Sequence, residues 1–308
     1  MAQPFVPLSY KNREEWLKLR QEGIGGSDAA TACGLNPWHQ PYELYLEKTQ
    51  PVTDEAPSEA AYFGSLLEDL IAQEYAKRTN QKVRRVNQLL RSMQWPWMLA
   101  NPDRVLVQQK KGLECKATGH LFNKDAWGEP GTDEVPEYYL IQCQHYMAVT
   151  GFDLFDLAVL IAGNRFEIYT IKRDDELILD LVQTEENFWE YIKTKTPPPM
   201  NFENPNTEAL LKKLYPGTNG RAKVLSEEAQ HYAIVERRAD EGIKRLTAIQ
   251  KEARSHLLAD MGESTYGILN DGTGYVRSQR HRKAYTVSET DYVELRFTEK
   301  ALEKSLNN

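Results

Sequence analysis

The chain has 308 residues, of which 41% are hydrophobic, with a mean hydropathy of −0.62 and a formal net charge of −7. This length allows one large domain, or one domain with an appendage. No apolar run approaches the length of a membrane span, and the N-terminus lacks the apolar core of a signal peptide, so we expect a cytoplasmic protein without membrane contact. The acidic balance disfavours a simple basic nucleic-acid binder, because affinity for phosphate backbones comes from Lys and Arg.

The positions of the basic residues and cysteines indicate which binding surfaces and metal sites the chain could have. Basic residues gather locally in two short stretches, each of which is either a binding patch or an ordinary solvated face. Three cysteines lie far apart and form no CxxC pair, which favours a reducing compartment and disfavours structural zinc or an iron–sulfur cluster. The two basic stretches hold Lys82, Arg84, Arg85 and Arg91, and Arg277, Arg280, His281, Arg282 and Lys283; the cysteines are Cys33, Cys115 and Cys143.

The N-terminal part predicts a helix over residues 10–22, followed by Gly-Ile-Gly-Gly-Ser27-Asp-Ala-Ala. Glycines before Ser-Asp and alanines predict a loop that enters a helix capped by Ser27. With Arg20 just upstream, free amides and a hydroxyl at this point could hold a phosphate. The alternative is a capped helix without any ligand.

Two further helices are predicted over residues 41–48 and 65–79, the second beginning after Gly64. Glu68 borders the apolar stripe of the second helix and is a candidate carboxylate for a site. Glu74 is equally well placed by periodicity, so spacing does not single out Glu68.

Strands are predicted over residues 83–90 and 95–100, and a β-hairpin over 103–116, with the polar link 108–112 as its turn. Glu114 and Lys116 are two residues apart on the return strand and therefore share a face. Asp103 joins that face if the hairpin loop has an even number of residues; a Lys110-Lys111 loop, for example, would do so. Two carboxylates beside a lysine suit phosphodiester hydrolysis with Mg²⁺ or Mn²⁺, which prefer oxygen ligands. An ordinary exposed hairpin is the alternative.

The remaining pattern completes an α/β core. An irregular loop is expected over 117–134, a helix from 136 to 150 with Gln142 and Tyr146 on one face, strands over 155–160 and 166–171, and a helix over 174–195. We therefore expect a domain over 1–199 with a mainly antiparallel sheet flanked by helices, and a linker over 200–225. An α-rich appendage over 226–308 is expected to hold a helix over 226–261 and a hairpin over 266–279.

These residues, in this order, resemble a known family. The elements are Trp16-x-x-x-Arg20, Gly-Ile-Gly-Gly-Ser27-Asp-Ala, Gly64-x-x-x-Glu68, Asn-Pro-Asp103, Leu-Glu114-Cys-Lys116 and Gln142-x-x-x-Tyr146. Together they resemble the YqaJ-type viral recombinases, phage alkaline exonucleases of the lambda exonuclease kind within the PD-(D/E)xK nuclease superfamily. The likeness covers roughly residues 10–195.

The resemblance implies Mg²⁺-dependent 5′→3′ digestion of one strand of linear duplex DNA, which leaves 3′ overhangs for recombination by strand annealing. It implies two Mg²⁺ ions per site, with Mn²⁺ as a substitute. Partners would be DNA ends, a ring-shaped homotrimer and a single-strand annealing protein, all in the cytoplasm of a host carrying the phage or prophage. The implied roles are as follows: metal ligands Asp103, Glu114 and the Cys115 carbonyl; catalytic residues Lys116, Glu68 and Gln142, with Gln144 as a competitor; 5′-phosphate pocket Arg20 and Ser27.

Two rival functions share these residues. A PD-(D/E)xK endonuclease would use the same site without needing a DNA end. A non-catalytic DNA-binding protein with a nuclease-like fold is the third possibility, although the acid, acid and lysine positions are all filled. An iron–sulfur exonuclease of the Cas4 kind is disfavoured, because it needs four cysteines and the chain has three.

Overall fold

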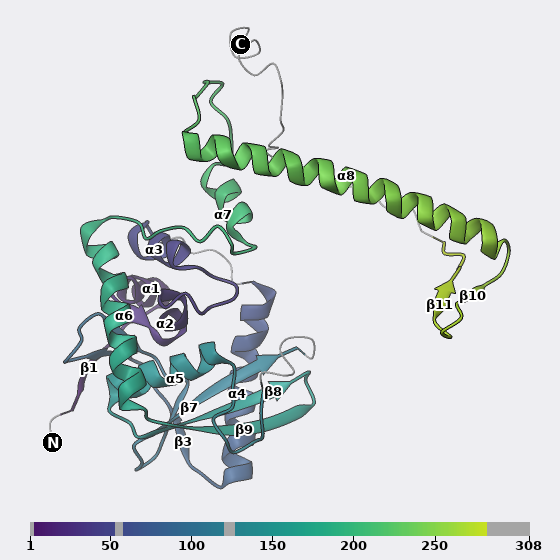
Figure 1. The fold of residues 1–308 in the computed structure, drawn as a ribbon. Coiled ribbons are helices and arrows are strands. Elements are labelled where there is room, and N and C mark those ends of the chain that lie inside the picture. Colours follow the sequence, from purple (N-terminus) through teal and green to yellow (C-terminus); the bar gives the residue numbers. More distant parts are fainter. Residues whose placement is uncertain (1–2, 53–57, 120–126, 282–308) are drawn as a thin grey trace. The chain divides into compact units, whose positions relative to one another are not determined.

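The computed structural model describes residues 3–52, 58–119 and 127–281, and the chain forms two compact units, Met1–Leu211 and Lys212–Asn308 (Figure 1). The first unit ends inside the stretch expected to be a linker. Among the described residues, no helix is both long and apolar enough to cross a membrane.

The centre of the first unit is a five-stranded sheet in the order β3-β6-β7-β8-β9. Three of its four strand pairs are antiparallel, and only β7 and β8 run parallel. The predicted class, α/β with a mixed and mainly antiparallel sheet flanked by helices, is confirmed. The strands span Val83–Arg85 (β3), Arg104–Leu106 (β6), Lys111–Thr118 (β7), Leu154–Ile161 (β8) and Arg165–Lys172 (β9).

Side-chain alternation along β7 and β8 gives this sheet two different faces. Leu113, Cys115 and Ala158 pack against helix α4 (Glu59–Thr79). The alternate residues of β8, such as Phe155 and Leu157, pack instead against helix α5 (Glu137–Thr150). Residues of β7 next to Leu113 and Cys115, namely Glu114 and Lys116, therefore face α5.

A second sheet, in the order β1-β4-β5-β2, joins the other side of α5. The single strand predicted over 83–90 is wrong, because β3 pairs with β6 in the first sheet whereas β4 pairs with β1 and β5 in the second. Strand β1 was not expected from the sequence. The bounds are Phe5–Leu8 (β1), Ile24–Gly25 (β2), Leu89–Ser92 (β4) and Met98–Ala100 (β5).

The other helices agree with the apolar periodicity, but three predicted starts are wrong, and α7 was not predicted because it lies inside the stretch 200–225 expected to be a linker. Helix α1 begins at Arg13, capped by Asn12, rather than at residue 10. Helix α2 begins at Gly26 with Gly25 as its N-cap, and Asp28 rather than Ser27 accepts the hydrogen bond from the Gly25 amide. Helix α4 begins at Glu59, capped by Ser58, so Gly64 lies inside it. The remaining bounds are Arg13–Gln21 (α1), Gly26–Ala32 (α2), Pro41–Thr49 (α3), Asp175–Thr194 (α6) and Thr207–Leu214 (α7).

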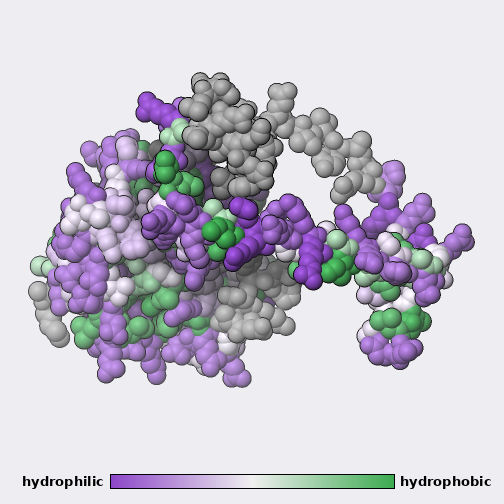
Figure 2. Space-filling model, turned by 45° about the horizontal axis from the view of Figure 1, so that its top comes forward, coloured by the Kyte–Doolittle hydropathy of each residue, from purple (hydrophilic) through white to green (hydrophobic). Residues whose placement is uncertain are grey.

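The second unit contains helix α8 (Glu227–Met261) and a hairpin of β10 (Tyr266–Ile268) and β11 (Gly274–Val276). Ser226 caps α8 as predicted, through its hydroxyl and the amide of Ala229. No residue of α8 is buried, and apolar side chains lie exposed along it, as Figure 2 shows for one face. Of the second basic stretch, Arg282 and Lys283 lie outside the described residues.

Candidate active site

The β6–β7 hairpin brings Asp103 and Glu114 together. Arg104 pairs with Leu113 and Val105 with Gly112, so the same register places Asp103 opposite Glu114 on one face. The loop between the strands, residues 107–110, has an even number of residues, as the shared face requires. The Lys110-Lys111 example and the turn at 108–112 are wrong. Gln108 takes a left-handed conformation (φ 65°) in the turn, and Gly112 lies within β7 under the ring of Phe155.

Lys116 and Gln142 meet on Glu114. The Lys116 Nζ lies 2.7 Å from Glu114 Oε1, and Gln142 Nε2 donates to the same oxygen at 2.6 Å. The other oxygen, Oε2, is buried without a protein partner. Burial disfavours the charge on Lys116, but Glu114 and Asp103 outweigh it and raise the pKa of the ammonium above its usual value.

Asp103 lies at the end of β6 beside the backbone of β7. Its Oδ2 accepts a hydrogen bond from the Cys115 amide at 2.8 Å. Burial, and after it the neighbouring Glu114, raise the pKa of Asp103 well above the usual value. The N–H and C=O of one strand residue point to the same edge, so the Cys115 carbonyl lies on the Asp103 side of β7.

Glu68 is not brought into this cluster. It extends from α4, on the opposite face of the sheet from α5, and its Oε1 pairs with Arg104 at 2.5 Å and with Arg85 at 3.3 Å. It is still close enough to Asp103 to contribute to the raised pKa of that carboxyl. The competing Glu74 pairs with Arg78 one turn further along the helix.

Of the two glutamines on α5, only Gln142 faces the acids. Gln144 is turned away: its amide nitrogen donates to the Lys172 carbonyl at 2.7 Å, and its oxygen accepts from the Asp174 amide at 3.1 Å. Gln144 therefore connects α5 to the start of α6.

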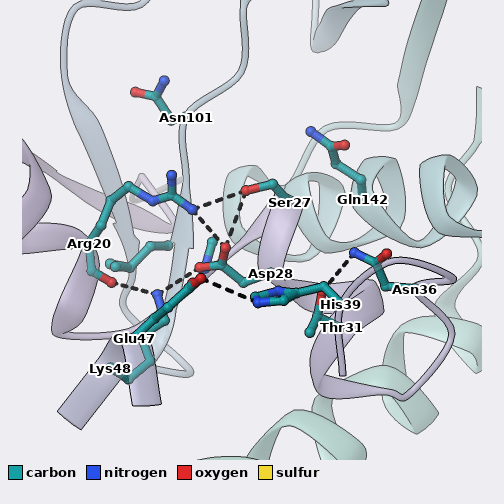
Figure 3. Close-up of polar contacts among 12 residues, drawn as sticks. Arg20, Ser27, Asp28, Thr31, Asn36, His39, Glu47, Lys48, Asn101 and Gln142 are labelled. Atoms are coloured by element: carbon teal, nitrogen blue, oxygen red, sulfur yellow. Dashed lines mark hydrogen bonds and ion pairs between the residues drawn. The ribbon is translucent and has the colours of Figure 1, made fainter. Parts of the chain in front are cut away.

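Arg20 and Ser27 form a second polar cluster with Asp28 (Figure 3). Arg20 Nη2 donates to Ser27 Oγ at 3.0 Å and to Asp28 Oδ1 at 2.7 Å. The guanidinium lies 5.1 Å from the centre of the Trp16 ring, one helical turn back, which explains the Trp-x-x-x-Arg spacing. Lys48 Nζ reaches the other Asp28 oxygen at 2.7 Å. Burial disfavours the charge on Asp28, but Arg20 and Lys48 outweigh it and lower the pKa of this carboxyl.

Tyr146 on α5 lies between the Arg20–Ser27–Asp28 cluster and the Asp103–Glu114–Lys116 cluster. Its hydroxyl accepts from Gln142 Nε2 at 3.1 Å and donates to the Asn101 carbonyl at 3.4 Å. Its ring packs on Gly26, where a Cβ would lie only 2.3 Å from the Tyr146 Cε1 atom. Tyr146 therefore lies between Gly26, which neighbours Ser27 of the Arg20 cluster, and Gln142, which binds Glu114.

The residues present fit a hard divalent cation. Asp103, Glu114 and the Cys115 carbonyl offer oxygen atoms, and Glu114 Oε2 is a buried acceptor without a protein donor. Across the part of the chain that the structure describes, no three His, Cys, Asp and Glu side chains gather as a ready metal site. An ion bound here would be held by two carboxylates and a backbone carbonyl.

Sequence comparisons place the chain in a family. A model of the YqaJ-like viral recombinase domain matches residues 15–153. A protein of Bacillus subtilis (strain 168), described as uncharacterized protein YqaJ, is 40% identical over 278 residues, which cover 88% of this chain and 85% of that protein. This chain belongs to the YqaJ family. Membership of a viral recombinase family, together with the acid–lysine cluster, supports a nuclease role.

Solved structures with a similar arrangement include two exonucleases. The alkaline exonuclease LHK-Exo from Laribacter hongkongensis is 20% identical, with a TM-score of 0.45, and the match covers 66% of this chain and all of that one. A phage-related exonuclease from Haemophilus somnus 129PT is 14% identical, with a TM-score of 0.43, and the match covers 58% of this chain and 99% of that one.

Sequence reasoning missed three partners of the predicted residues. Arg104, which holds Glu68, follows Asp103 directly but was read only as part of a strand. Asp28 stands in the Gly-rich motif without a role of its own. Lys48 lies 20 residues beyond Asp28 on α3, and only the packing of α3 against α1 and α2 brings it near.

Proposed function

We propose that this protein is a Mg²⁺-dependent exonuclease that degrades one strand of linear duplex DNA from a 5′-phosphorylated end. The observation that supports the proposal most is the link through Tyr146 between the Arg20–Ser27 pair and the Asp103–Glu114–Lys116 cluster. A pocket for a terminal phosphate beside a hydrolytic cluster suits an enzyme that starts at DNA ends. An endonuclease does not need such a pocket.

The proposed chemistry uses the residues as the structure places them. Asp103, Glu114 and the Cys115 carbonyl would hold Mg²⁺, which offsets phosphate charge and lowers the pKa of the attacking water. Lys116 would orient the water and place positive charge next to the phosphate as negative charge develops. Gln142, fixed between Glu114 and Tyr146, would keep the Glu114 carboxylate in one orientation.

The products fit repeated cleavage from the same end. Water oxygen bonds to the phosphorus between the first two nucleotides, the bond from that phosphorus to the 3′ oxygen breaks, and this oxygen takes a proton. The released nucleotide keeps its 5′-phosphate, and the shortened strand gains a new one. The Arg20–Ser27 pocket would therefore meet the same group after each step, and the other strand would remain as a 3′ overhang.

Arg20 is the residue on which end recognition depends. Its side chain is 28% exposed, so it can reach a ligand while Asp28 and Ser27 hold the guanidinium. A terminal phosphate carries more charge than an internal diester, and a guanidinium can bind it through two parallel hydrogen bonds. The loss of one charge-assisted contact costs about 1.5–3 kcal/mol, or roughly ten- to a hundredfold in rate at low substrate concentration.

One set of substrates tests the proposal. Linear duplexes with 5′-phosphate or 5′-hydroxyl ends, and covalently closed circles, are incubated with the protein with and without Mg²⁺. We expect digestion of linear DNA only, dependence on Mg²⁺, and faster digestion from phosphorylated ends, a preference that Arg20→Ala mostly removes and Arg20→Lys restores poorly. Cutting of closed circles would instead support the endonuclease, and no cutting of any substrate would support a DNA-binding protein.

We also propose, from the family resemblance, that the protein assembles as a ring-shaped homotrimer and delivers overhangs to a single-strand annealing protein. A ring retains DNA topologically, which would offset the net charge of −7. Light scattering of the purified protein tests the trimer, and a dimer or monomer at working concentration would overturn it.

A further inference from the structure

Lys48 is a buried ammonium in the wall of the Arg20 cluster. Its side chain is 5% exposed, and its Nζ donates to Asp28 Oδ2 at 2.7 Å and to the Arg20 carbonyl at 2.8 Å (Figure 3). Burial of an ammonium is energetically costly, so its position beside Asp28 calls for a compensating role in the structure or in function.

The net charge of the Arg20–Asp28–Lys48 cluster suggests a role for the buried ammonium. Asp28 binds Arg20 through one oxygen and Lys48 through the other, so the three side chains sum to one positive charge. Without Lys48, the carboxylate that fixes Arg20 would also cancel its charge, and the pair would offer an anion no net attraction. Glu47, a further acid that acts on Arg20 and Lys48, is 62% exposed and lies 3.3 Å from His39, so solvent screens much of its charge.

We propose that Lys48 is a positioning residue for end recognition: its ammonium cancels the charge of Asp28, so that Arg20 is held rigidly yet stays attractive to a terminal phosphate. This inference rests on the proposed function and assigns to Lys48 the charge balance of that pocket. Asp28 accepts hydrogen bonds from Arg20 and from the Gly25 amide, so it fixes the guanidinium relative to the start of α2.

The test separates charge balance from simple structural support. Binding of a DNA hairpin with one duplex end, carrying either a 5′-phosphate or a 5′-hydroxyl, is measured by fluorescence anisotropy without divalent ions, and the ratio of the two affinities is compared. The variants are Lys48→Met, Lys48→Arg and the double variant Asp28→Asn/Lys48→Met. The matched control is Lys111→Met, because Lys111 forms a partly buried ion pair with Asp156 at 2.7 Å outside both clusters.

We expect Lys48→Met to lower the phosphate preference by about ten- to thirtyfold, as removal of one unit charge at roughly 8 Å does at an effective dielectric constant near 20. Lys48→Arg and Lys111→Met should keep the preference. The double variant again leaves one positive charge, on Arg20, and should return the ratio to within a few-fold of the wild type. A side chain that only supports the fold would not be rescued by removal of its partner's charge.

The possible results distinguish the role of Lys48 from the existence of the phosphate pocket. A wild-type preference that persists in Lys48→Met, or a low ratio that persists in the double variant, would overturn the role of Lys48 while leaving the pocket intact. Equal affinity of the wild type for both ends would overturn the pocket itself, and with it this inference. If Lys48→Met does not fold, the double variant decides, since removal of both members of a buried ion pair is better tolerated than removal of one.

Discussion

Replacement of Gly26 by alanine tests whether α2 and α5 pack as closely as the structure shows. A Cβ at Gly26 would lie 2.3 Å from Tyr146 Cε1 and 2.6 Å from Cζ, whereas ordinary contacts begin near 3.4 Å. The ring or the helix would have to move by about 1 Å, the difference between the 2.3 Å approach and an ordinary contact of 3.4 Å. The Tyr146 ring also packs against Phe155, with ring centroids 5.5 Å apart, which limits the room it has to turn.

The expected cost follows from overpacking. Insertion of a methyl group into a packed interior destabilises by about 1–3 kcal/mol. Alanine regains part of this because it loses less backbone entropy than glycine, about 0.5–1 kcal/mol. We therefore expect Gly26→Ala to lower the free energy of unfolding by about 1–2 kcal/mol.

Gly64 provides a matched control in the same unit. It lies inside α4, and a Cβ there would meet no heavy atom within 4 Å. Gly64→Ala should therefore raise the free energy of unfolding by about 0.5–1 kcal/mol. Urea denaturation followed by circular dichroism gives both values under one condition. Equal stabilisation by the two substitutions would refute the close contact between Gly26 and Tyr146.

Three further predictions concern charge. Lys116→Ala should lower the hydrolysis rate at least about a hundredfold while DNA affinity in a gel-shift titration changes only a few-fold; an equal loss of affinity would make Lys116 mainly a binding residue. Asp103→Ala should weaken Mn²⁺ binding in calorimetric titration, and unchanged binding would contradict its role as a ligand. Burial opposes the charge on His145, but Glu185, 2.7 Å away, outweighs it and raises the pKa of His145, so the native state keeps this proton longer than the unfolded chain. The contribution of His145 to stability should be fully present below pH about 6.5 and be lost as pH rises through the native pKa, by at most about 1.4 kcal/mol per pH unit, and His145→Gln should remove this contribution from the pH dependence of denaturation curves.

The elements that the sequence predicted best are those whose ends carry strong signals. Helix α8 begins after Ser226 and ends before Gly262, as its cap residues indicate. Strands β8 and β9 were placed to within one residue, because apolar runs between turn residues are typical of buried strands. The chain's change of sheet between β3 and β4 could not be predicted, because it depends on which strands are available to pair rather than on local pattern.

In the candidate site too, local spacing predicted some features, whereas others depend on contacts between distant segments. Two-residue spacing alone was enough to place Glu114 and Lys116 on one face, and their position toward α5 followed once the sheet had formed. The choice between Gln142 and Gln144 could not follow from periodicity, because residues 141–150 of α5 are buried on every side. Glu68 was placed on the correct helix, yet its partner Arg104 comes from a strand, so its orientation depends on a contact between distant segments.

The charge of the whole chain is a poor guide to what its surface attracts, and the Arg20 cluster shows why. Electrostatic interactions are screened over about 8 Å at physiological ionic strength, so a terminal phosphate would respond to Arg20, Asp28 and Lys48 far more than to the net charge of −7. Within that range one buried ammonium determines whether the cluster is neutral or positive. The acids Asp103 and Glu114 lie on the other side of Tyr146, where a divalent cation rather than a lysine would balance them. Tyr146 thus separates a region that needs excess positive charge from one that needs excess negative charge, and it does so with a neutral side chain.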